Sequence, residues 1–156
     1  MNKIALILLI FIGLSYKAAA QDFESGITDQ EIEMAKYDKD PQANAVFLNE
    51  FGNTRIDEYM DHIRLIYTYH AKIKIFTKEG LNHGTIEIPI HNGDNSAEEV
   101  NNVTGFTYYK DDNGIIQKAE LDSKKVFTVK DYKYGSTVKF ALPALRPGCV
   151  IEFKYE

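Results

Sequence analysis

Residues 62–78 read HIRLIYTYHAKIKIFTK, and the alternation within this stretch decides the fold. Its even-numbered positions are mostly polar, with Ile66 and Phe76 as the exceptions. Side chains of a strand alternate between two faces, whereas a helix needs apolar residues three and four positions apart. The stretch therefore predicts one long strand with one apolar face, which other strands must cover. The apolar face consists of Ile63, Leu65, Tyr67, Tyr69, Ala71, Ile73 and Ile75.

The next apolar segment, Thr85–His91, alternates in the same way. The loop before it contains two glycines and an asparagine, so the sequence predicts a hairpin between this segment and the long strand. A register with Thr77 opposite Gly84 places the isoleucines of both strands on one face, whereas a slip of one residue would separate them. Pro89 cannot donate to the ladder, which predicts an edge strand or a bulge. The register predicts the pairs Ile75–Ile86, Ile73–Ile88, Ala71–Ile90, Lys74–Glu87 and His70–His91.

The rest of the chain predicts one short helix and several short strands. Thr28 and Glu31 have the spacing of a capping box, so a helix is expected within 27–36. Asp-Asp-Asn-Gly at 111–114 is a strong hairpin signal. Short strands separated by turn residues predict an antiparallel β-sandwich-like domain with one short N-terminal helix. The other strands are expected at Ala45–Leu48, Asn53–Met60, Val103–Lys110, Ile115–Leu121, Val126–Val129, Thr137–Phe140 and Cys149–Tyr155.

The first twenty residues have the composition of a secretory signal peptide. Lys3 gives a positive start, residues 4–14 form an apolar run, and residues 18–20 are all alanine. The apolar run is shorter than the roughly 20 residues that cross a bilayer. We therefore expect cleavage between Ala20 and Gln21 and a mature protein, without a transmembrane segment, in the periplasm or outside the cell. The expected organisation is a signal peptide at 1–20, a helix and connection at 21–44, and the β-sandwich-like domain at 45–156.

The composition is that of a globular protein and argues against nucleic acid as a partner. Hydrophobic residues make up 44% of the chain and charged residues 26%, both ordinary values. Removal of the leader takes Lys3 and Lys17, which leaves 16 basic and 23 acidic residues and a net charge of -7. No basic stretch with interleaved aromatic residues occurs. The sequence therefore predicts no nucleic-acid binding.

Three landmarks along the chain are similar to one protein family. The first comprises residues 27–31, Tyr37 and residues 40–48, which read DPQANAVFL. The second is His70–Phe76 with Gly80 just after it. The third is Phe140-Ala141-Leu142-Pro143 followed by Gly148–Tyr155. In this order and at this spacing, they resemble the DUF3857 domain of secreted bacterial proteins, mostly from Bacteroidetes.

The resemblance implies a β-rich module that precedes a transglutaminase-like domain with a papain-type Cys-His-Asp site. Proteins of this kind are often described as transglutaminases or proteases. The family module itself has no established catalytic residues, so the resemblance transfers none to this chain. Relatives continue where this chain stops at Glu156, so the domain is expected to be truncated at its C-terminal end.

Cys149 is the one cysteine of the chain and the obvious candidate nucleophile. On a strand it would share a face with Ile151, Phe153 and Tyr155, which is a core face. A reactive cysteine needs a nearby base and often a helix N-terminus, and the neighbouring sequence offers neither. A free cysteine is also among the most frequently buried residues. We expect Cys149 to be structural.

The predicted register suggests one candidate metal site. Directly opposite residues have Cβ atoms about 4.5–5.5 Å apart, so His70 and His91 could share a metal, and Glu87 could add a carboxylate. Lys72 and Lys74 on the same face would repel a cation, so the alternative is a solvated polar face without metal. We therefore assign no metal, no cofactor and no catalytic residue.

Aromatic residues offer a second kind of candidate site. A ligand platform could form from tyrosines on the sheet surface, although aromatic residues in sheet proteins more often pack in the core or across strands. The candidates are Tyr108, Tyr109, Tyr132 and Tyr134.

The sequence therefore favours a non-catalytic binding or docking module of an exported protein. By the resemblance it would accompany a transglutaminase-like domain, in substrate binding or domain docking. An alternative is a stand-alone cell-envelope protein that binds a glycan or a protein. A hydrolase or transferase is less favoured, because no acid, base and nucleophile converge in the sequence.

Overall fold

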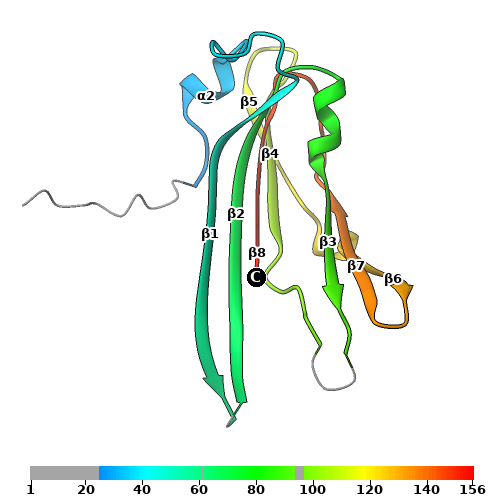
Figure 1. The fold of residues 1–156 in the computed structure, drawn as a ribbon. Helices are drawn as coiled ribbons and strands as arrows, with labels where there is room; N and C mark the ends of the chain where they lie inside the picture. Colours follow the sequence, from blue (N-terminus) through cyan, green and yellow to red (C-terminus); the bar gives the residue numbers. More distant parts are fainter. Residues whose placement is uncertain (1–24, 61, 94–96) are drawn as a thin grey trace, which may run out of the picture.

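The computed structural model describes residues 25–60, 62–93 and 97–156, which form two antiparallel sheets that face each other (Figure 1). The first sheet has the strand order β1-β2-β8-β4-β5, and the second has the order β3-β7-β6. This confirms the predicted antiparallel β-sandwich-like fold. The strands are β1 (Ala45–Tyr59), β2 (His62–Ile75), β3 (Thr85–His91), β4 (Thr104–Lys110), β5 (Ile116–Glu120), β6 (Phe127–Tyr132), β7 (Gly135–Ala141) and β8 (Val150–Tyr155).

The hydrophobic core fills the space between the two sheets. The apolar face of β2 forms one wall of it, and burial of that face is the main driving force for the fold. Phe140 of β7 meets Phe153 of β8 edge to face across the space, with ring centroids 6.2 Å apart. The core residues are Ala71, Ile73, Ile75, Ile86, Leu121, Phe140, Leu142, Cys149, Ile151 and Phe153.

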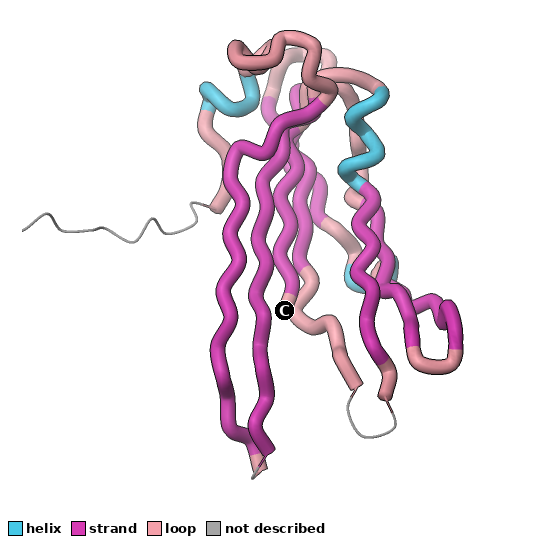
Figure 2. Tube along the Cα trace, viewed as in Figure 1, coloured by secondary structure: helices cyan, strands magenta, loops and turns pink. Residues whose placement is uncertain are grey.

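Strands β1 and β2 form a long hairpin that extends past the second sheet (Figure 2). The two strands predicted at Ala45–Leu48 and Asn53–Met60 are parts of the single strand β1, with a bulge at Leu48. Met60 has a φ of 50° at the turn, where the chain reverses direction. Among the described residues, the second sheet therefore does not cover the apolar side of the outer half of the hairpin.

The predicted hairpin between β2 and β3 is wrong. β2 pairs with β1 and β8, whereas β3 pairs with β7 in the other sheet. The segment Glu79–Gly84 forms a 3-10 helix, η2, which carries the chain from one sheet to the other (Figure 1). The isoleucines still belong to one core, but they face each other across the sandwich. The prediction that Pro89 lies on an edge strand is confirmed, because β3 is at the edge of its sheet.

A short helix, α2 (Asp29–Glu33), covers the other face of the five-stranded sheet. Its capping box is confirmed, since the Thr28 hydroxyl accepts from the Glu31 amide and the Glu31 carboxylate accepts from the Thr28 amide. Ile32 of this helix packs against Tyr108 and Val150 on the sheet. Within the described residues, none of the helices has the length and apolar character needed to cross a membrane.

Two isoleucines on the same face of β2 allow a direct test of this architecture. Ile73 is 2% exposed, whereas Ile63 is 80% exposed. Ile73→Ala should lower the free energy of unfolding by about 2–5 kcal/mol, because it leaves a cavity in the core. Ile63→Ala should lower it by less than about 1 kcal/mol, the range of strand propensity. Urea denaturation of the two variants measures the difference. An equal loss of unfolding free energy in both variants would contradict the finding that only half of the apolar face of β2 is covered.

Cys149 immediately precedes β8 and is fully buried in the core. Burial raises the pKa of its thiol, which disfavours the thiolate form that reacts. We predict that an alkylating reagent modifies Cys149 only after the protein is unfolded in denaturant. Mass spectrometry with and without denaturant measures this, and rapid labelling of the folded protein would show an accessible thiol instead.

Candidate binding surface

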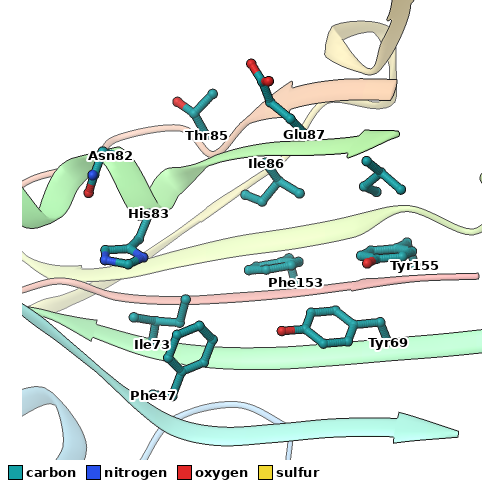
Figure 3. Close-up of a pocket in the computed structure, with 11 residues that line it drawn as sticks. Phe47, Tyr69, Ile73, Asn82, His83, Thr85, Ile86, Glu87, Phe153 and Tyr155 are labelled. Carbon is teal, nitrogen blue, oxygen red and sulfur yellow. The ribbon is translucent and has the colours of Figure 1, made fainter. Parts of the chain in front are cut away.

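An open cleft lies between the sheets, on the side where β1 and β3 form the two edges (Figure 3). It has a volume of about 310 Å³. Ile73, Phe153 and Tyr69 line its floor, and Ile86 points down onto them from β3 (Figure 3). Phe47 and His83 close one end, with their rings edge to face at 6.3 Å. The cleft is therefore an open edge of the hydrophobic core.

A row of aromatic rings continues from the cleft along the five-stranded sheet. The Tyr69 ring lies 6.0 Å from Phe153, 5.3 Å from Tyr155 and 6.4 Å from Tyr67, measured between centroids. Tyr67 in turn covers Gly52, where a Cβ atom would come within 2.8 Å of the Tyr67 hydroxyl. The absence of a side chain at Gly52 thus makes room for the Tyr67 ring. The row of aromatic rings therefore extends from the core onto the β1–β2 hairpin.

The Tyr69 hydroxyl fixes the middle of this row. It donates a 2.5 Å hydrogen bond to the Glu50 carboxylate of β1. Burial and this carboxylate both raise the pKa of Tyr69, so the phenol stays protonated over the ordinary pH range. The ring is therefore held with its apolar faces toward its neighbours.

Beyond the aromatic row, the apolar side of the hairpin is uncovered. Ile56 of β1 lies directly opposite Leu65 of β2, and the two are 75% and 72% exposed. Ile63 is still more exposed, and Tyr67 is about half exposed. These side chains share a face with the buried isoleucines of β2. We call the four residues Ile56, Ile63, Leu65 and Tyr67 the hairpin face.

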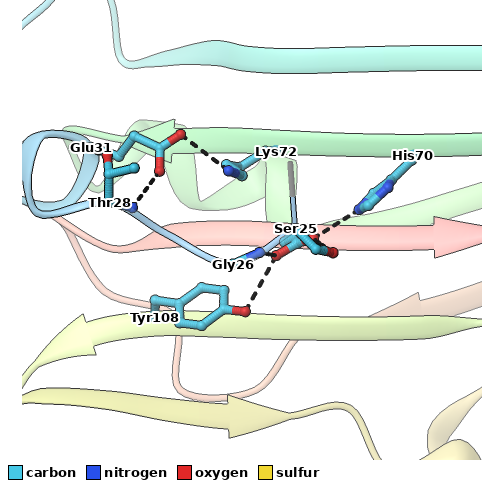
Figure 4. Close-up of polar contacts among 8 residues, drawn as sticks. Ser25, Gly26, Thr28, Glu31, His70, Lys72 and Tyr108 are labelled. Atoms are coloured by element: carbon cyan, nitrogen blue, oxygen red, sulfur yellow. Dashed lines mark hydrogen bonds and ion pairs between the residues drawn. The ribbon is translucent and has the colours of Figure 1, made fainter. Parts of the chain in front are cut away.

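The opposite face of the same sheet carries a buried polar cluster around Glu152 of β8. The carboxylate is 2% exposed and accepts from the Ser25 hydroxyl at 2.8 Å and the Gly26 amide at 3.0 Å. The Nε2 atom of His70 lies 2.9 Å from it and the Tyr108 hydroxyl 3.3 Å from it. Figure 4 shows these contacts converging from the N-terminal segment, β2 and β4.

This cluster does not have the geometry of a nucleophilic triad. In a triad the imidazole lies between the hydroxyl and the carboxylate, so that it can take the hydroxyl proton. Here the carboxylate lies between Ser25 and His70, and it satisfies the hydrogen-bond donors of both. Burial and the Glu152 carboxylate raise the pKa of Tyr108 to about 12, so this phenol remains a donor. The arrangement holds the N-terminal segment on the sheet.

Two buried lysines hold the same segment. Lys72 pairs with Glu31 of α2 at 3.1 Å. Lys74 is 1% exposed and donates to the carbonyl oxygens of Ile32 at 2.7 Å and Gly148 at 2.6 Å. A buried ammonium must find such partners, because its desolvation is otherwise very costly. The polar side of β2 is therefore covered at Lys72 and Lys74, where the sequence left a solvated face as the alternative to a metal site.

The candidate metal pair does not form as predicted. His70 lies in the Glu152 cluster, whereas His91 lies on β3, in the other sheet, opposite Gly135 and beside the Tyr134 ring. Glu87 pairs with Lys139 of β7 at 2.9 Å instead of Lys74. Within the described ranges, no group of three or more histidine, cysteine or acidic side chains has the spacing to hold a metal ion.

The four candidate tyrosines do not form one platform. Tyr108 and Tyr109 are neighbours on β4 and so point to opposite faces of the sheet. Tyr108 is buried, and Arg146 lies over the Tyr109 ring at 3.9 Å. Tyr132 is exposed on the second sheet. The aromatic row that forms instead uses Tyr67 and Tyr69, which the alternation of β2 had already placed together on its apolar face.

The chain matches no protein-family model, and no curated protein and no solved structure matches it. The resemblance to the DUF3857 domain therefore rests on the sequence landmarks at residues 27–48, 70–80 and 140–155.

We predict that the stability of the fold depends on pH through His70 of the Glu152 cluster. Burial lowers the pKa of His70, although Glu152 opposes this. Below the unfolded pKa of about 6.5, the unfolded chain then binds more protons than the folded chain, so the free energy of unfolding should fall as pH falls. His70→Gln keeps a donor for Glu152 but cannot titrate, so it should reduce this decline.

Urea denaturation at pH 7.5 and pH 5.5 measures the effect. The matched control is His62→Gln, at the exposed end of the hairpin, which should keep the wild-type decline. A decline that His70→Gln leaves unchanged would show that other groups cause it.

Proposed function

We propose that this chain is a non-catalytic β-rich module of an exported bacterial protein, and that it docks against a partner protein or domain through the hairpin face. The observation that carries the proposal is the exposure of Ile56, Ile63 and Leu65 on the same face as the buried core of β2. Soluble proteins rarely expose contiguous apolar surface of this kind unless it is an interaction site. The resemblance to the DUF3857 domain suggests a transglutaminase-like domain as the partner.

The surface has the anatomy of a docking site. Its centre is apolar and aromatic, and its rim is polar, with Glu50 and Glu58 of β1 on the same side of the hairpin. Aromatic residues in such a position contribute strongly to binding, because they bury much area at little cost in side-chain entropy. The rim charges would contribute more to the choice of partner than to affinity.

The polar chemistry of the described residues also favours a non-catalytic module. Glu152, His70 and Ser25 are engaged with one another, and the cluster lies under the N-terminal segment on the face away from the cleft. Cys149 is in the core. Two of the sequence candidates, Cys149 and His70, therefore have structural roles.

A second candidate function is a stand-alone envelope protein that binds a glycan in the cleft. The cleft supports it, because aromatic rings there stand beside polar side chains such as Asn82 and His83. A sugar ring could stack on an aromatic face while its hydroxyls bond to such groups. Polysaccharide retained by the protein, and lost in a Tyr155→Ala variant, would favour this function over protein docking.

A photo-crosslinking experiment tests the docking function. A benzophenone side chain at position 65 should yield an adduct of defined mass in cells that produce the protein, because Leu65 is at the centre of the hairpin face. The control position is Ile115, which is 58% exposed but lies in the β4–β5 turn at the other end of the sheet (Figure 1).

The adduct should also disappear when Ile56 and Ile63 are both replaced by threonine, which retains strand propensity but removes apolar surface. Adducts of equal yield from positions 65 and 115 would mean that the hairpin face has no special affinity. The absence of any adduct from position 65 would contradict the docking function.

A further inference from the structure

Strand β1 forms one edge of the five-stranded sheet. The sheet has the order β1-β2-β8-β4-β5, so none of the described strands lies beyond β1 on the side away from β2 (Figure 1). β1 runs over 15 residues, and a long edge presents a row of main-chain N–H and C=O groups to which another strand can pair. The cleft opens on the same side of the molecule, since Phe47 of β1 and Ile86 of β3 both line it.

The orientation of the main chain follows from two hydrogen bonds at the inner end of β2. The amide of Ile75 donates to the carbonyl of Cys149 at 3.0 Å, toward β8. The amide of Phe76 donates to the carbonyl of Asn44 at 2.8 Å, toward β1. Main-chain groups alternate sides along a strand, so the even-numbered residues of β2 face β1.

The pairing of the two strands then gives the orientation of β1. Beyond the bulge at Leu48, the even-numbered residues of β2 lie opposite odd-numbered residues of β1, for example Thr68 opposite Asn53. Directly opposite residues of an antiparallel pair either both face each other or both face away. The even-numbered residues of β1 therefore direct their main-chain groups to the open edge and their side chains to the side of the hairpin face. These residues are Glu50, Gly52, Thr54, Ile56 and Glu58.

The other edge strands of the two sheets have features that hinder pairing with a further strand. On β3, the amide of His91 is bonded to the Glu98 carboxylate at 2.8 Å, and Pro89, two positions earlier, has no N–H. β5 has only five residues, with Lys118 at its centre. β6 contains Lys130, beside an irregularity in its pairing with β7. Such devices protect sheet edges, and the even-numbered positions at the centre of the β1 edge contain none of them.

Two glutamates lie at the ends of this open stretch. Glu50 and Glu58 have their side chains on the side of the hairpin face, with three uncharged residues between them. Within the described residues, the outer halves of β1 and β2 contribute no basic side chain to this side. The Glu50 carboxylate accepts from Tyr69, but a carboxylate can accept several hydrogen bonds. The open stretch is therefore complementary to a strand that is apolar at its centre and basic at its ends.

The charges on the other face of the hairpin are paired within the chain. Arg64 lies 2.6 Å from the Asp57 carboxylate, and Arg55 lies 3.6 Å from the Glu156 carboxylate. Opposite charges that already compensate each other contribute little to the choice of a partner. Selection by charge therefore depends on the two glutamates of the hairpin-face side.

We infer that residues 50–58 of β1 accept one extended strand from a partner polypeptide, with apolar side chains on the hairpin face and basic side chains beside Glu50 and Glu58. This inference rests on the proposed docking function and specifies its partner. Strand addition to an open sheet edge is a common mode of peptide recognition, in which main-chain hydrogen bonds give affinity and alternate side chains give selectivity. The added strand would extend the five-stranded sheet on the side where the cleft opens.

A second copy of this chain fits the edge less well. In the antiparallel register that overlaps residues 50–58 of both copies completely, Glu50 of each copy lies opposite Glu58 of the other. Like charges directly opposite each other on neighbouring strands are destabilising. A strand with basic ends replaces both of these repulsions by ion pairs.

A short synthetic peptide can test the inference on the whole protein. The probe is fluorescein-labelled Lys-Thr-Val-Ser-Val-Thr-Val-Ser-Lys amide, with binding measured by fluorescence anisotropy. In the antiparallel register its lysines lie opposite Glu50 and Glu58. Its valines lie opposite Gly52, Thr54 and Ile56 and direct their amides toward β1.

Two N-methylated peptides separate main-chain pairing from side-chain contact. N-methylation of the three valine amides should weaken binding at least about tenfold, because three hydrogen bonds are lost. N-methylation of the Thr, Ser and Thr that precede the valines should leave binding nearly unchanged, because those amides point away from β1.

The preference for basic ends has its own control. Glu58→Gln should weaken binding of the lysine peptide by about two- to fivefold, the range of an exposed ion pair. It should leave binding of a peptide with glutamine in place of both lysines unchanged. The matched variant is Glu120→Gln on β5, at the opposite edge of the same sheet, which should leave binding of both peptides unchanged. Equal losses for the two peptides in the Glu58→Gln variant would contradict the role of charge.

The outcomes separate this inference from the docking function. Equal binding of the two N-methylated peptides, or no peptide binding while position 65 still crosslinks, would overturn strand addition but leave docking through the hairpin face intact. Sedimentation analysis tests the choice of partner. A concentration-dependent dimer that Ile56→Lys abolishes would overturn that choice, whereas a monomer with selective peptide binding supports it.

Discussion

The structure depends on one constraint: strand β2 has a single apolar face along its whole length, but only half of that face is covered. Ala71, Ile73 and Ile75 lie under the three-stranded sheet and are almost completely buried. Ile63 and Leu65 continue the same face past the end of that sheet and are mostly exposed. The strands of the small sheet are half as long as β2, so they cannot cover it. The inner half of β2 therefore stabilises the fold, and the outer half forms the exposed hairpin face.

The polar side of β2 shows that the fold has a third layer. Lys72 and Lys74 are too deeply buried to remain hydrated, so each needs an acceptor from the protein. The N-terminal segment provides these acceptors through Glu31 and the carbonyl of Ile32, and Glu152 accepts from Ser25 and Gly26. Breaking one such contact would leave a buried charge unpaired, which is strongly destabilising. The segment is thus a structural part of the domain.

Local features of the fold could be predicted from the sequence because they depend on neighbouring residues. The alternation of β2 and the capping box of Thr28 and Glu31 are of this kind. Strand pairing could not be predicted in the same way. Ile73 and Ile86 can be brought together as neighbours in one sheet or as facing residues in two sheets, and alternation satisfies both arrangements. The structure adopts the second, because β1 and β8 already occupy both edges of the inner half of β2.

The candidate site was missed for a related reason. The sequence showed that Leu65 and Tyr67 share the apolar face of β2, and an apolar face predicts burial. Whether a residue of that face is buried depends on how far the opposing sheet extends over it. The local sequence pattern of β2 does not reveal that length. An exposed apolar face also favours aggregation, so a protein that retains one is expected to have it covered in its working state. The cleft, the aromatic row and the hairpin face adjoin one another, so the partner proposed above could cover all three and extend the core beyond Tyr69.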